Sequence, residues 1–430
     1  MAAPRSLAGW LDYIERRHPQ AIALGLERVA PVQTRLGSVI RCPVITVAGT
    51  NGKGSTCAML EAILRAAGYR TGMYTSPHLL RYNERVRIGA RQVDDALLCA
   101  AFEAVERARG DVALTYFEYG TLAALRLFAD TRLDVLVLEV GLGGRLDAVN
   151  IVDPDCAVLT SVGIDHVEYL GNTREAIGAE KAGIFRASRP AVVADPDPPR
   201  SVIGHAQAIG ARPLLIGTDF GYLREGGQWT YWGPHGRRSA LAYPTLRGAA
   251  QLRNAAAALC ALDTLRERLP VAMQEVRSGL AEATLPGRFQ VLPGRPQIVL
   301  DVAHNPDAAA TLAENLAASG FSPETIAVFA MLRDKDIAGV IRAVAARITR
   351  WHVASLPGPR GARAAQLTAQ LRVAGVSAPV SEHESPDEAF AAARNEAGEN
   401  DKILIFGSFL TVGKVMARLE TERSGEASHG

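Results

Sequence analysis

Hydrophobic residues of this chain follow two different spacings, which alternate from one segment of the sequence to the next. Continuous apolar runs at Val44–Ala48, Leu133–Val140 and Cys156–Val162 are typical of strands buried on both faces of a parallel sheet. Between such runs, as in Cys57–Ala67 and Thr173–Gly183, apolar residues recur three or four positions apart, which is the spacing of amphipathic helices. Strands that alternate with helices predict an α/β fold with doubly wound parallel sheets.

The same two spacings place further elements in the first two thirds of the chain. We expect helices at Ser6–Arg17, Asp94–Arg107, Tyr116–Asp130 and Gly248–Leu265, strands at Thr71–Thr75 and Ala191–Ala194, and an extended segment at Asn83–Ile88. Residues 218–245 alternate aromatic and polar positions between glycine pairs, which predicts a small antiparallel hairpin region.

A proline- and glycine-rich stretch at 285–296 is the best candidate for a domain boundary. After it a second alternation begins, with strands at Ile298–Val302, Ile326–Met331, His352–Ser355 and Lys402–Phe406, and helices at Asp307–Ser319, Ile337–Ile348 and Ala364–Ala374. The sequence therefore predicts two doubly wound lobes, a larger domain at 1–286 and a smaller Rossmann-like domain at 287–430. The polar tail from Thr421 is expected to fray.

Composition and charge exclude several classes of protein. The 430 residues are 48% hydrophobic and 21% charged with a net charge of +2, so we expect a globular protein without a nucleic-acid partner. A membrane span needs about 20 apolar residues in a row, and no such run exists, so no membrane partner is expected. The N-terminus is amphipathic and charged, unlike a signal peptide. The five scattered cysteines (Cys42, Cys57, Cys99, Cys156 and Cys260) are typical of reduced thiols in the cytoplasm, not of a disulfide framework or zinc site.

The most specific chemistry lies in Gly49–Ser55, where a glycine-rich loop containing Lys53 joins a strand to a helix. Backbone N–H groups, the helix N-terminus and the lysine make such a loop a site for phosphate, and a hydroxyl can reach a metal ion. The sequence differs from the usual phosphate-loop motif, because Val47 occupies the position of the first glycine and Gly54 separates Lys53 from Ser55. This loop predicts that the domain at 1–286 is P-loop ATPase-like. The alternative is a tight strand–helix turn with an incidental lysine.

Three polar residues follow other predicted strands. Glu139, Ser76 and His166 all fall at carboxyl ends of strands, where ligands of doubly wound sheets bind. Glu139 is a candidate Mg²⁺ ligand, or a strand-end carboxylate that faces water. His166 can equally be a loop histidine with no role in a site, since imidazole is not a ligand that Mg²⁺ prefers. Ser76 can equally begin the turn before Pro77.

Two further candidates also have structural explanations. Lys181 can be one solvated lysine on a helix. Asn305 and Pro306 are typical of a helix N-cap and first helical position, but this leaves Asp301 and His304 unexplained at the end of a strand.

Taken together, these motifs resemble those of the folylpolyglutamate synthase/dihydrofolate synthase family of Mur-ligase-like, ATP-dependent amide ligases. The resemblance covers nearly the whole chain, and the motifs come in the family's order: GTNGKGS at 49–55, TSPHL at 75–79, NERVRI at 83–88, FE at 117–118, LEVGLGGRLDA at 138–148, GIDH at 163–166, EKAGI at 180–184, DVAHNP at 301–306 and GSF-x-TVG at 407–413. The sequence departs from the family's pattern at Ala250, a position where many members of the family have histidine.

The resemblance implies a role for each matching residue. Catalytic roles fall to Lys53, Glu139, His166 and Lys181. ATP contacts fall to Gly49, Thr50, Asn51, Gly52, Lys53, Gly54, Ser55, Asn254, Arg288, Asp301 and His304. Metal ligands would be Ser55, Ser76, Glu139, His166 and Lys181, with Lys181 carboxylated on its Nζ. Folate contacts would be Leu24, Gly25, Arg28, Arg85, Phe117, Arg145 and Asp147.

The implied reaction joins L-glutamate to a pteroate or folate carboxylate through an acyl phosphate, and ATP is the third substrate. The resemblance also implies two Mg²⁺ ions and allows a monovalent cation. It implies that the protein is a monomer in the cytoplasm. Many bacterial relatives make both dihydrofolate and folylpolyglutamate. The alternatives are a synthase with the polyglutamate activity alone, another Mur-type ligase that acts on cell-wall precursors, and a nucleotide-gated binding protein without ligase activity.

Overall fold

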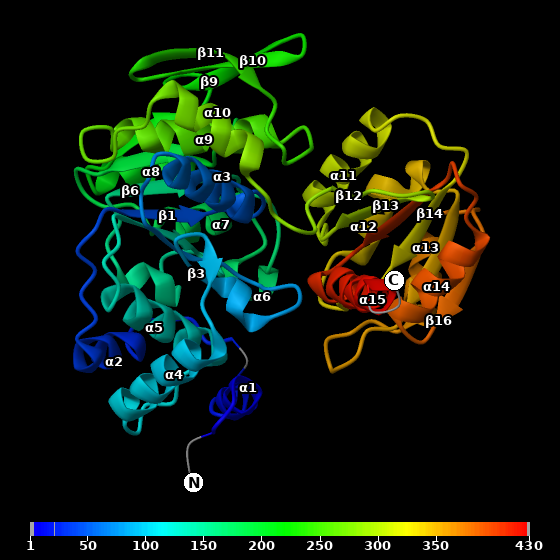
Figure 1. The fold of residues 1–430 in the computed structure, drawn as a ribbon, viewed down its shortest axis with the longest axis horizontal. Coiled ribbons are helices and arrows are strands. Elements are labelled where there is room, and N and C mark those ends of the chain that lie inside the picture. Colours follow the sequence, from blue (N-terminus) through cyan, green and yellow to red (C-terminus); the bar gives the residue numbers. More distant parts are fainter. Residues whose placement is uncertain (1–3, 21, 428–430) are drawn as a thin grey trace. The chain divides into compact units, whose positions relative to one another are not determined.

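A computed structural model describes residues 4–20 and 22–427 of the chain. The chain divides into two compact units, which are described separately (Figure 1). Within the described residues, the first unit comprises 4–20, 22–78, 82–245 and 252–284, and the second comprises 79–81, 246–251 and 285–427. The predicted domain limits, 1–286 and 287–430, stay a prediction.

The first unit is organised around an eight-stranded sheet in the order β4-β3-β2-β5-β1-β6-β7-β8. The strands are β1 Val44–Ala48, β2 Thr71–Tyr74, β3 Val86–Ile88, β4 Arg91–Gln92, β5 Val135–Glu139, β6 Cys156–Leu159, β7 Pro190–Val193 and β8 Arg212–Leu215. The six strands from β2 to β8 in this order are parallel, and β3 and β4 add an antiparallel edge. From β1 the chain passes to β2 on one side and later, through β5, to β6 on the other. The carboxyl end of β1 is therefore a topological switch point, where doubly wound sheets bind ligands.

Helices cover both faces of this sheet. They are α1 Leu7–Glu15, α2 Val29–Leu36, α3 Lys53–Ala66, α4 Asp95–Arg109, α5 Tyr116–Ala129, α6 Val167–Leu170, α7 Arg174–Ala182, α8 Arg200–Ala208, α9 Gln251–Thr264 and α10 Met273–Glu282, with 3₁₀ turns at Tyr82–Arg85 and Ala148–Ile151. Val44 and Ala48 are four residues apart in β1, so their side chains lie on the same face of the sheet. Two apolar cores meet on this face: Val44 belongs to the core under α1, α2, α4 and α5, and Ala48 belongs to the core under α7 and α8. In Figure 1, α3, α9 and α10 lie together.

A small antiparallel sheet confirms the hairpin region that the sequence predicts. It consists of β9 Gly221–Glu225, β10 Gln228–Gly233 and β11 Gly236–Ala242, with β10 in the centre. Asp263 of α9 holds it: one carboxylate oxygen accepts a hydrogen bond from the Tyr231 hydroxyl at 2.8 Å, and the other pairs with Arg238 at 3.0 Å.

The second unit is built around a six-stranded sheet in the order β12-β13-β17-β14-β15-β16, parallel except for β12. Its strands are β12 Gln290–Leu292, β13 Gln297–Asp301, β14 Thr325–Phe329, β15 Arg350–Ala354, β16 Val380–His383 and β17 Lys402–Phe406. Its helices are α11 Pro306–Ala318, α12 Ile337–Val344, α13 Ala364–Val373, α14 Pro386–Glu396 and α15 Phe409–Ala427, with a 3₁₀ turn at Ala345–Arg347. One apolar core lies under α11, α12 and α13, and another under α14 and α15. The doubly wound α/β prediction is therefore confirmed for both units.

Some local predictions were wrong. The tail from Thr421 is helical as far as Ala427, because Glu422 pairs with Arg418 at 2.9 Å on α15 and with Arg394 at 2.6 Å on α14. Residues 428–430 of that tail lie outside the described part. The predicted helix at Ile337–Ile348 ends at Val344 and continues as a 3₁₀ turn, and the predicted extended segment at Asn83–Ile88 begins with a 3₁₀ turn. The sequence analysis missed α6, α8, α10, α14, α15, β4, β8, β12 and β16.

All five cysteines are free, which confirms that they form no disulfide framework. Among the described residues, every helix is too short or too polar to cross a bilayer.

Candidate active site

The glycine-rich loop leaves the buried strand β1 and enters α3 at Lys53. Gly52 has a φ of +89°, a left-handed conformation that favours glycine, and a Cβ at this position would lie 2.6 Å from Oδ1 of Asn254. Lys53 Nζ donates hydrogen bonds to the carbonyls of Gly49 at 2.9 Å and Thr50 at 3.2 Å, so its ammonium lies over the loop. The structure thus brings Lys53, the loop and Asn254 of α9 together.

Glu139 ends β5, which pairs directly with β1, so that Val47 and Glu139 are register partners. Its side chain is buried, and one carboxylate oxygen accepts a hydrogen bond from the backbone N–H of Ser76 at 3.2 Å. Ser55, on the first turn of α3, is also buried. A carboxylate withdrawn from water at the carboxyl ends of adjacent strands does not fit the water-facing alternative for Glu139.

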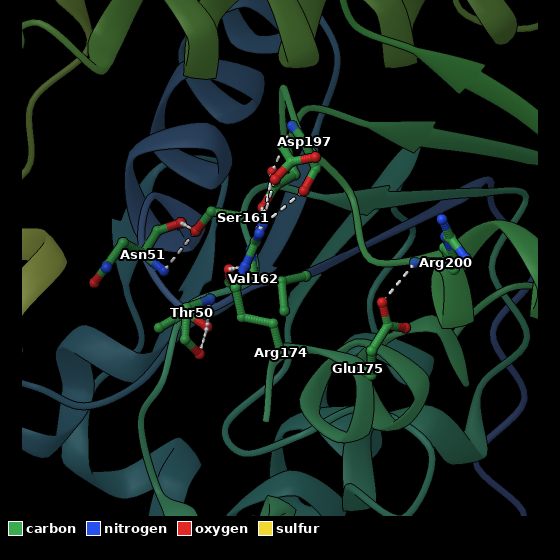
Figure 2. Close-up of polar contacts among 10 residues, drawn as sticks. Thr50, Asn51, Ser161, Val162, Arg174, Glu175, Asp197 and Arg200 are labelled. Atoms are coloured by element: carbon green, nitrogen blue, oxygen red, sulfur yellow. Dashed lines mark hydrogen bonds and ion pairs between the residues drawn. The ribbon is translucent and has the colours of Figure 1, made fainter. Parts of the chain in front are cut away.

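His166 follows β6 and begins the short helix α6. Its φ of +53° lies in the left-handed region, which residues other than glycine seldom adopt and which is often found at functional sites. Its Nε2 lies 3.9 Å from a carboxylate oxygen of Asp165. The loop that carries it also holds the glycine-rich loop: the Thr50 hydroxyl donates to the Gly163 carbonyl at 3.1 Å, and Ser161 accepts from the Asn51 N–H at 3.0 Å (Figure 2).

Lys181 lies near the end of α7 and is only 4% exposed. Burial, together with the positive charge of Lys53, lowers the pKa of its ammonium to about 7, although the charges of Asp165 and Asp147 act in the opposite direction. The solvated alternative for Lys181 is therefore wrong. A buried amine that is partly neutral near pH 7 is a nucleophile able to react with CO₂.

The donor set fits a hard divalent cation that also binds substrate phosphate. Within residues 4–20 and 22–427 there is no group of three or more His, Cys, Asp or Glu side chains placed to hold a metal by itself. Mg²⁺ is usually held by one or two carboxylates with waters and substrate phosphates, so such a group is not required. A buried carboxylate at Glu139 that contacts the backbone of Ser76, together with the buried Ser55 at the start of α3, suits this mode of binding.

The predicted folate residues of the first unit form two groups. In the first group, Gly25 N–H donates to Leu146 O at 3.1 Å, and Arg28 pairs with Glu118 at 2.8 Å. Leu24 packs against the core under α7 and α8. The polar groups of this segment are thus largely engaged by the protein itself.

In the second group, Arg85 lies over the rings of Tyr82 at 5.3 Å and Tyr116 at 5.6 Å, and its Nε donates to Nδ1 of His78 at 2.9 Å. The ring of Phe117 lies 6.1 Å from that of Tyr74. This cluster of rings around one guanidinium is suited to a planar aromatic ligand with an acidic group.

Arg145 and Asp147 support the loop after β5. Arg145 pairs with Glu180 of α7 at 2.7 Å. Asp147 accepts hydrogen bonds from the N–H groups of Leu142 at 2.8 Å and Val149 at 2.9 Å, and burial raises the pKa of its carboxyl to about 6. In this structure both residues bind protein groups, which leaves their folate role a prediction.

Three predicted nucleotide residues belong to the second unit and lie together there. Asp301 accepts hydrogen bonds from the N–H groups of Phe289 and Ala303, both at 2.8 Å, and burial raises the pKa of its carboxyl. His304 Nδ1 lies 2.8 Å from the Val302 carbonyl, and the ring of Phe409 lies 6.0 Å from His304 and 5.0 Å from the Arg288 guanidinium. Asn305 caps α11 with Pro306 in its first turn, as the helix-cap interpretation predicts.

The sequence analysis missed Thr160 and Ser161, which bind the backbone of the glycine-rich loop. Thr160 donates a hydrogen bond to Asn51 O at 2.7 Å, and Ser161 contacts the same residue. The available signal was their position directly after β6, the strand that pairs with β1.

Comparison with known proteins identifies the family. The Mur ligase middle domain matches residues 47–262, and the Mur ligase glutamate ligase domain matches residues 287–409. The dihydrofolate synthase/folylpolyglutamate synthase of Escherichia coli is 46% identical over 98% of both chains, and that of Bacillus subtilis is 32% identical over 95% of this chain.

Solved structures agree with these relatives. E. coli FolC in complex with DHPP and ADP superimposes with a TM-score of 0.93 at 45% identity, covering 98% of this chain and 100% of that one. A bifunctional folylpolyglutamate synthase/dihydrofolate synthase with Mn, AMPPNP and L-glutamate bound gives a TM-score of 0.90 at 46% identity, covering 98% and 99%. The chain belongs to the dihydrofolate synthase/folylpolyglutamate synthase family of Mur-type ligases, as its motifs predict.

Proposed function

We propose that this chain is an ATP-dependent ligase that joins L-glutamate to dihydropteroate, giving dihydrofolate, and extends tetrahydrofolate with further glutamates. Two relatives that match 98% of this chain, at 46% and 40% identity, carry both activities in their names. The structural observation that supports this best is the buried Glu139 carboxylate at the end of the strand next to β1, with the buried Lys181, whose amine is partly neutral near pH 7, in the same unit.

The proposed reaction has two steps. The substrate carboxylate attacks the γ-phosphorus of ATP, the bond to ADP breaks, and an acyl phosphate forms. The α-amine of L-glutamate then attacks the acyl carbon, phosphate leaves, and the amine loses a proton as the amide forms. The protein's contribution is to position the three substrates and to stabilise charge.

The phosphates of ATP are the proposed ligand of the glycine-rich loop. Backbone N–H groups of residues 49–55 and the N-terminus of α3 would bind the phosphate oxygens, and Lys53 would neutralise the charge that develops during transfer. Asn254 would contact the nucleotide from α9, and Arg288, Asp301 and His304 keep the nucleotide role that the resemblance gives them.

Metal ligands in this proposal are Ser55, Ser76, Glu139, His166 and the carboxylated side chain of Lys181. They would hold two Mg²⁺ ions, which neutralise phosphate charge when bound. We also propose that a monovalent cation binds to the protein. A solved relative contains Mn and AMPPNP, which supports divalent metal and nucleotide use by this fold. Carboxylation would convert the Lys181 cation into an oxygen ligand.

The folate is proposed to bind in the first unit. Arg85 and Phe117 would contact the planar ring system or its acidic group, and Leu24, Gly25, Arg28, Arg145 and Asp147 would shape the site around it. We propose that domain 1–286 binds ATP and folate, and that domain 287–430 binds L-glutamate. The chain is proposed to act as a monomer in the cytoplasm, without nucleic-acid or membrane partners.

The decisive experiment measures ADP release and the mass of the product with L-glutamate and three acceptors in separate reactions. Dihydropteroate and tetrahydrofolate should each give ADP and a product heavier by one glutamyl residue. Turnover with tetrahydrofolate alone would identify a synthase with one activity, and turnover with a UDP-linked sugar acid alone would identify a cell-wall ligase. ATP binding without any amide product would overturn the proposal in favour of a nucleotide-gated binding protein.

A further inference from the structure

The loop at residues 160–166, between β6 and α6, is held from two sides. On one side it contacts the glycine-rich loop, where the Thr50 N–H donates to Ser161 O at 2.8 Å and the Ser161 hydroxyl donates to Asn51 O at 3.0 Å. These bonds transmit any movement of residues 160–163 directly to the backbone that is proposed to bind phosphate.

On its other side, an ion pair binds both backbone groups of Val162. The Val162 N–H donates to Asp195 Oδ2 at 2.6 Å, and Arg174 Nε donates to the Val162 carbonyl at 2.9 Å. Arg174 and Asp195 are themselves 3.3 Å apart, and Asp195 is 6% exposed. Arg174 also binds Asp197, with 3.1 Å between Nη1 and Oδ2 (Figure 2). One residue of the loop is thus fixed at its donor and its acceptor.

The two charged residues come from elements that matter to the proposed site. Arg174 is the first residue of α7, the helix that carries Lys181, and Asp195 follows β7. Through Val162 the pair joins α7, the end of β7 and the loop that carries His166. A buried carboxylate paired with an arginine fixes geometry well, because removing either partner leaves charge or N–H groups without compensation.

We infer that Arg174 and Asp195 are positioning residues, which hold the 160–166 loop so that the glycine-rich loop and His166 keep the geometry needed for nucleotide binding and phosphoryl transfer. This inference rests on the proposed function for its effect on turnover. Its effect on nucleotide affinity needs only the phosphate role of residues 49–55.

The test measures the affinity for AMPPNP with Mn²⁺ by calorimetry, together with kcat for ADP release and the melting temperature. The variants are Asp195→Ala, Arg174→Ala and the conservative Arg174→Lys. We expect the two alanine variants to raise the Kd for AMPPNP about tenfold and to lower kcat by about 10- to 100-fold, since displacements near 1 Å can cost that much. Arg174→Lys should recover part of both losses, because it keeps a cation beside Asp195.

Glu175→Ala is the matched control, because Glu175 is the next residue of α7 and has a structural contact elsewhere. Its carboxylate accepts hydrogen bonds from the N–H groups of Arg200 at 3.0 Å and Ser201 at 2.8 Å, at the start of α8 (Figure 2). It should lower the melting temperature and leave the Kd and kcat near the wild-type values.

Two results would overturn the inference. One is an unchanged Kd for AMPPNP in both alanine variants, measured well below their melting temperatures. The other is a loss in Glu175→Ala as large as theirs, which would make the effect one of stability alone. If Asp195→Ala does not fold, the partly exposed Arg174 still provides the test. If the wild-type protein binds AMPPNP but turns over no folate, the proposed function fails while the Kd still decides the role of the pair.

Discussion

Arg28 and Glu118 form an ion pair, with 2.8 Å between Nη2 and Oε1, in which the Glu118 side chain is only 4% exposed. Glu118 also completes the capping box of α5 by accepting a hydrogen bond from the Thr115 N–H at 2.8 Å. Arg28 donates in addition to the Ala23 carbonyl at 2.6 Å. One carboxylate therefore fixes both the 23–28 segment and the start of the helix that carries Phe117.

The first prediction concerns this pair. In Arg28→Ala the 23–28 segment loses its attachment to α5, so we expect KM for dihydropteroate to rise about tenfold, equivalent to about 1.4 kcal/mol of binding free energy. We expect the tetrahydrofolate reaction to change less, and such a selective effect would assign the 23–28 segment to dihydropteroate. Steady-state assays with the two acceptors test this.

Arg35→Ala is the control for Arg28→Ala, because Arg35 binds the carbonyls of Ala108 and Arg109, both at 3.0 Å, at the end of α4. Both KM values should stay near wild type in this variant. Equal increases for both acceptors in Arg28→Ala would argue against a selective role of the segment.

Lys53→Ala tests the phosphate loop. The ammonium that lies over the carbonyls of Gly49 and Thr50 is the cation proposed to stabilise the transferring phosphoryl group. Its loss should lower the rate of ADP formation by at least about 100-fold with little change in melting temperature. Lys414→Ala, at an exposed position of α15, should behave as wild type. Ordinary turnover by Lys53→Ala would refute the assignment of this loop.

The sequence predicts the central features of the site because they depend on local pattern. An apolar strand followed by glycines and a helix defines the loop at Gly49–Ser55, and a strand that ends in Glu139 predicts a carboxylate at the same edge of the sheet. Both follow from the rule that parallel strands present their carboxyl ends together.

Contacts between distant parts of the sequence are not encoded in such local patterns. Neither spacing nor periodicity could show that Asp195 meets Val162 33 residues earlier, or that Glu422 stabilises the C-terminal helix through Arg394 of α14. The helices α8 and α14 were missed for a related reason, since they are short and few of their residues are buried, which weakens the apolar periodicity.

The third prediction concerns carboxylation of Lys181. Because burial lowers the pKa of its ammonium to about 7, roughly half of the amine is neutral at pH 7 and can react with CO₂. Protein equilibrated with ¹³C-bicarbonate should show a carbamate signal by NMR, and ADP formation should fall in CO₂-free buffer. The signal should disappear in Lys181→Arg and persist in Lys402→Arg, which changes a buried lysine of the second unit. A missing signal with unchanged activity in CO₂-free buffer would exclude the modification.

The last prediction concerns His78, whose Nδ1 accepts the hydrogen bond from Arg85 and is therefore unprotonated in the folded protein. Burial, together with the positive charge of Arg85, lowers the pKa of His78 from 6.5 to about 4, although the charge of Glu84 acts in the opposite direction. Between these two pKa values the unfolded chain binds the proton and the folded chain does not. The contribution of His78 to stability is thus fully present above pH 6.5 and is lost as the pH falls toward 4.

Replacing His78 with glutamine removes this titration while keeping an oxygen that can accept from Arg85. The free energy of unfolding of His78→Gln should therefore decline less than that of wild type between pH 6.5 and pH 4. Because His78 is only partly buried and solvent screens its charge, we expect the difference to grow to about 1–2 kcal/mol at the acid end. Urea unfolding at pH 7, 5.5 and 4.5 measures it, and only the difference between the two proteins counts, because other carboxyl groups titrate in both. His235→Gln, at an exposed turn before β11, is the histidine control and should follow the wild-type curve. Parallel curves for wild type and His78→Gln would show that the Arg85 contact does not hold His78 neutral.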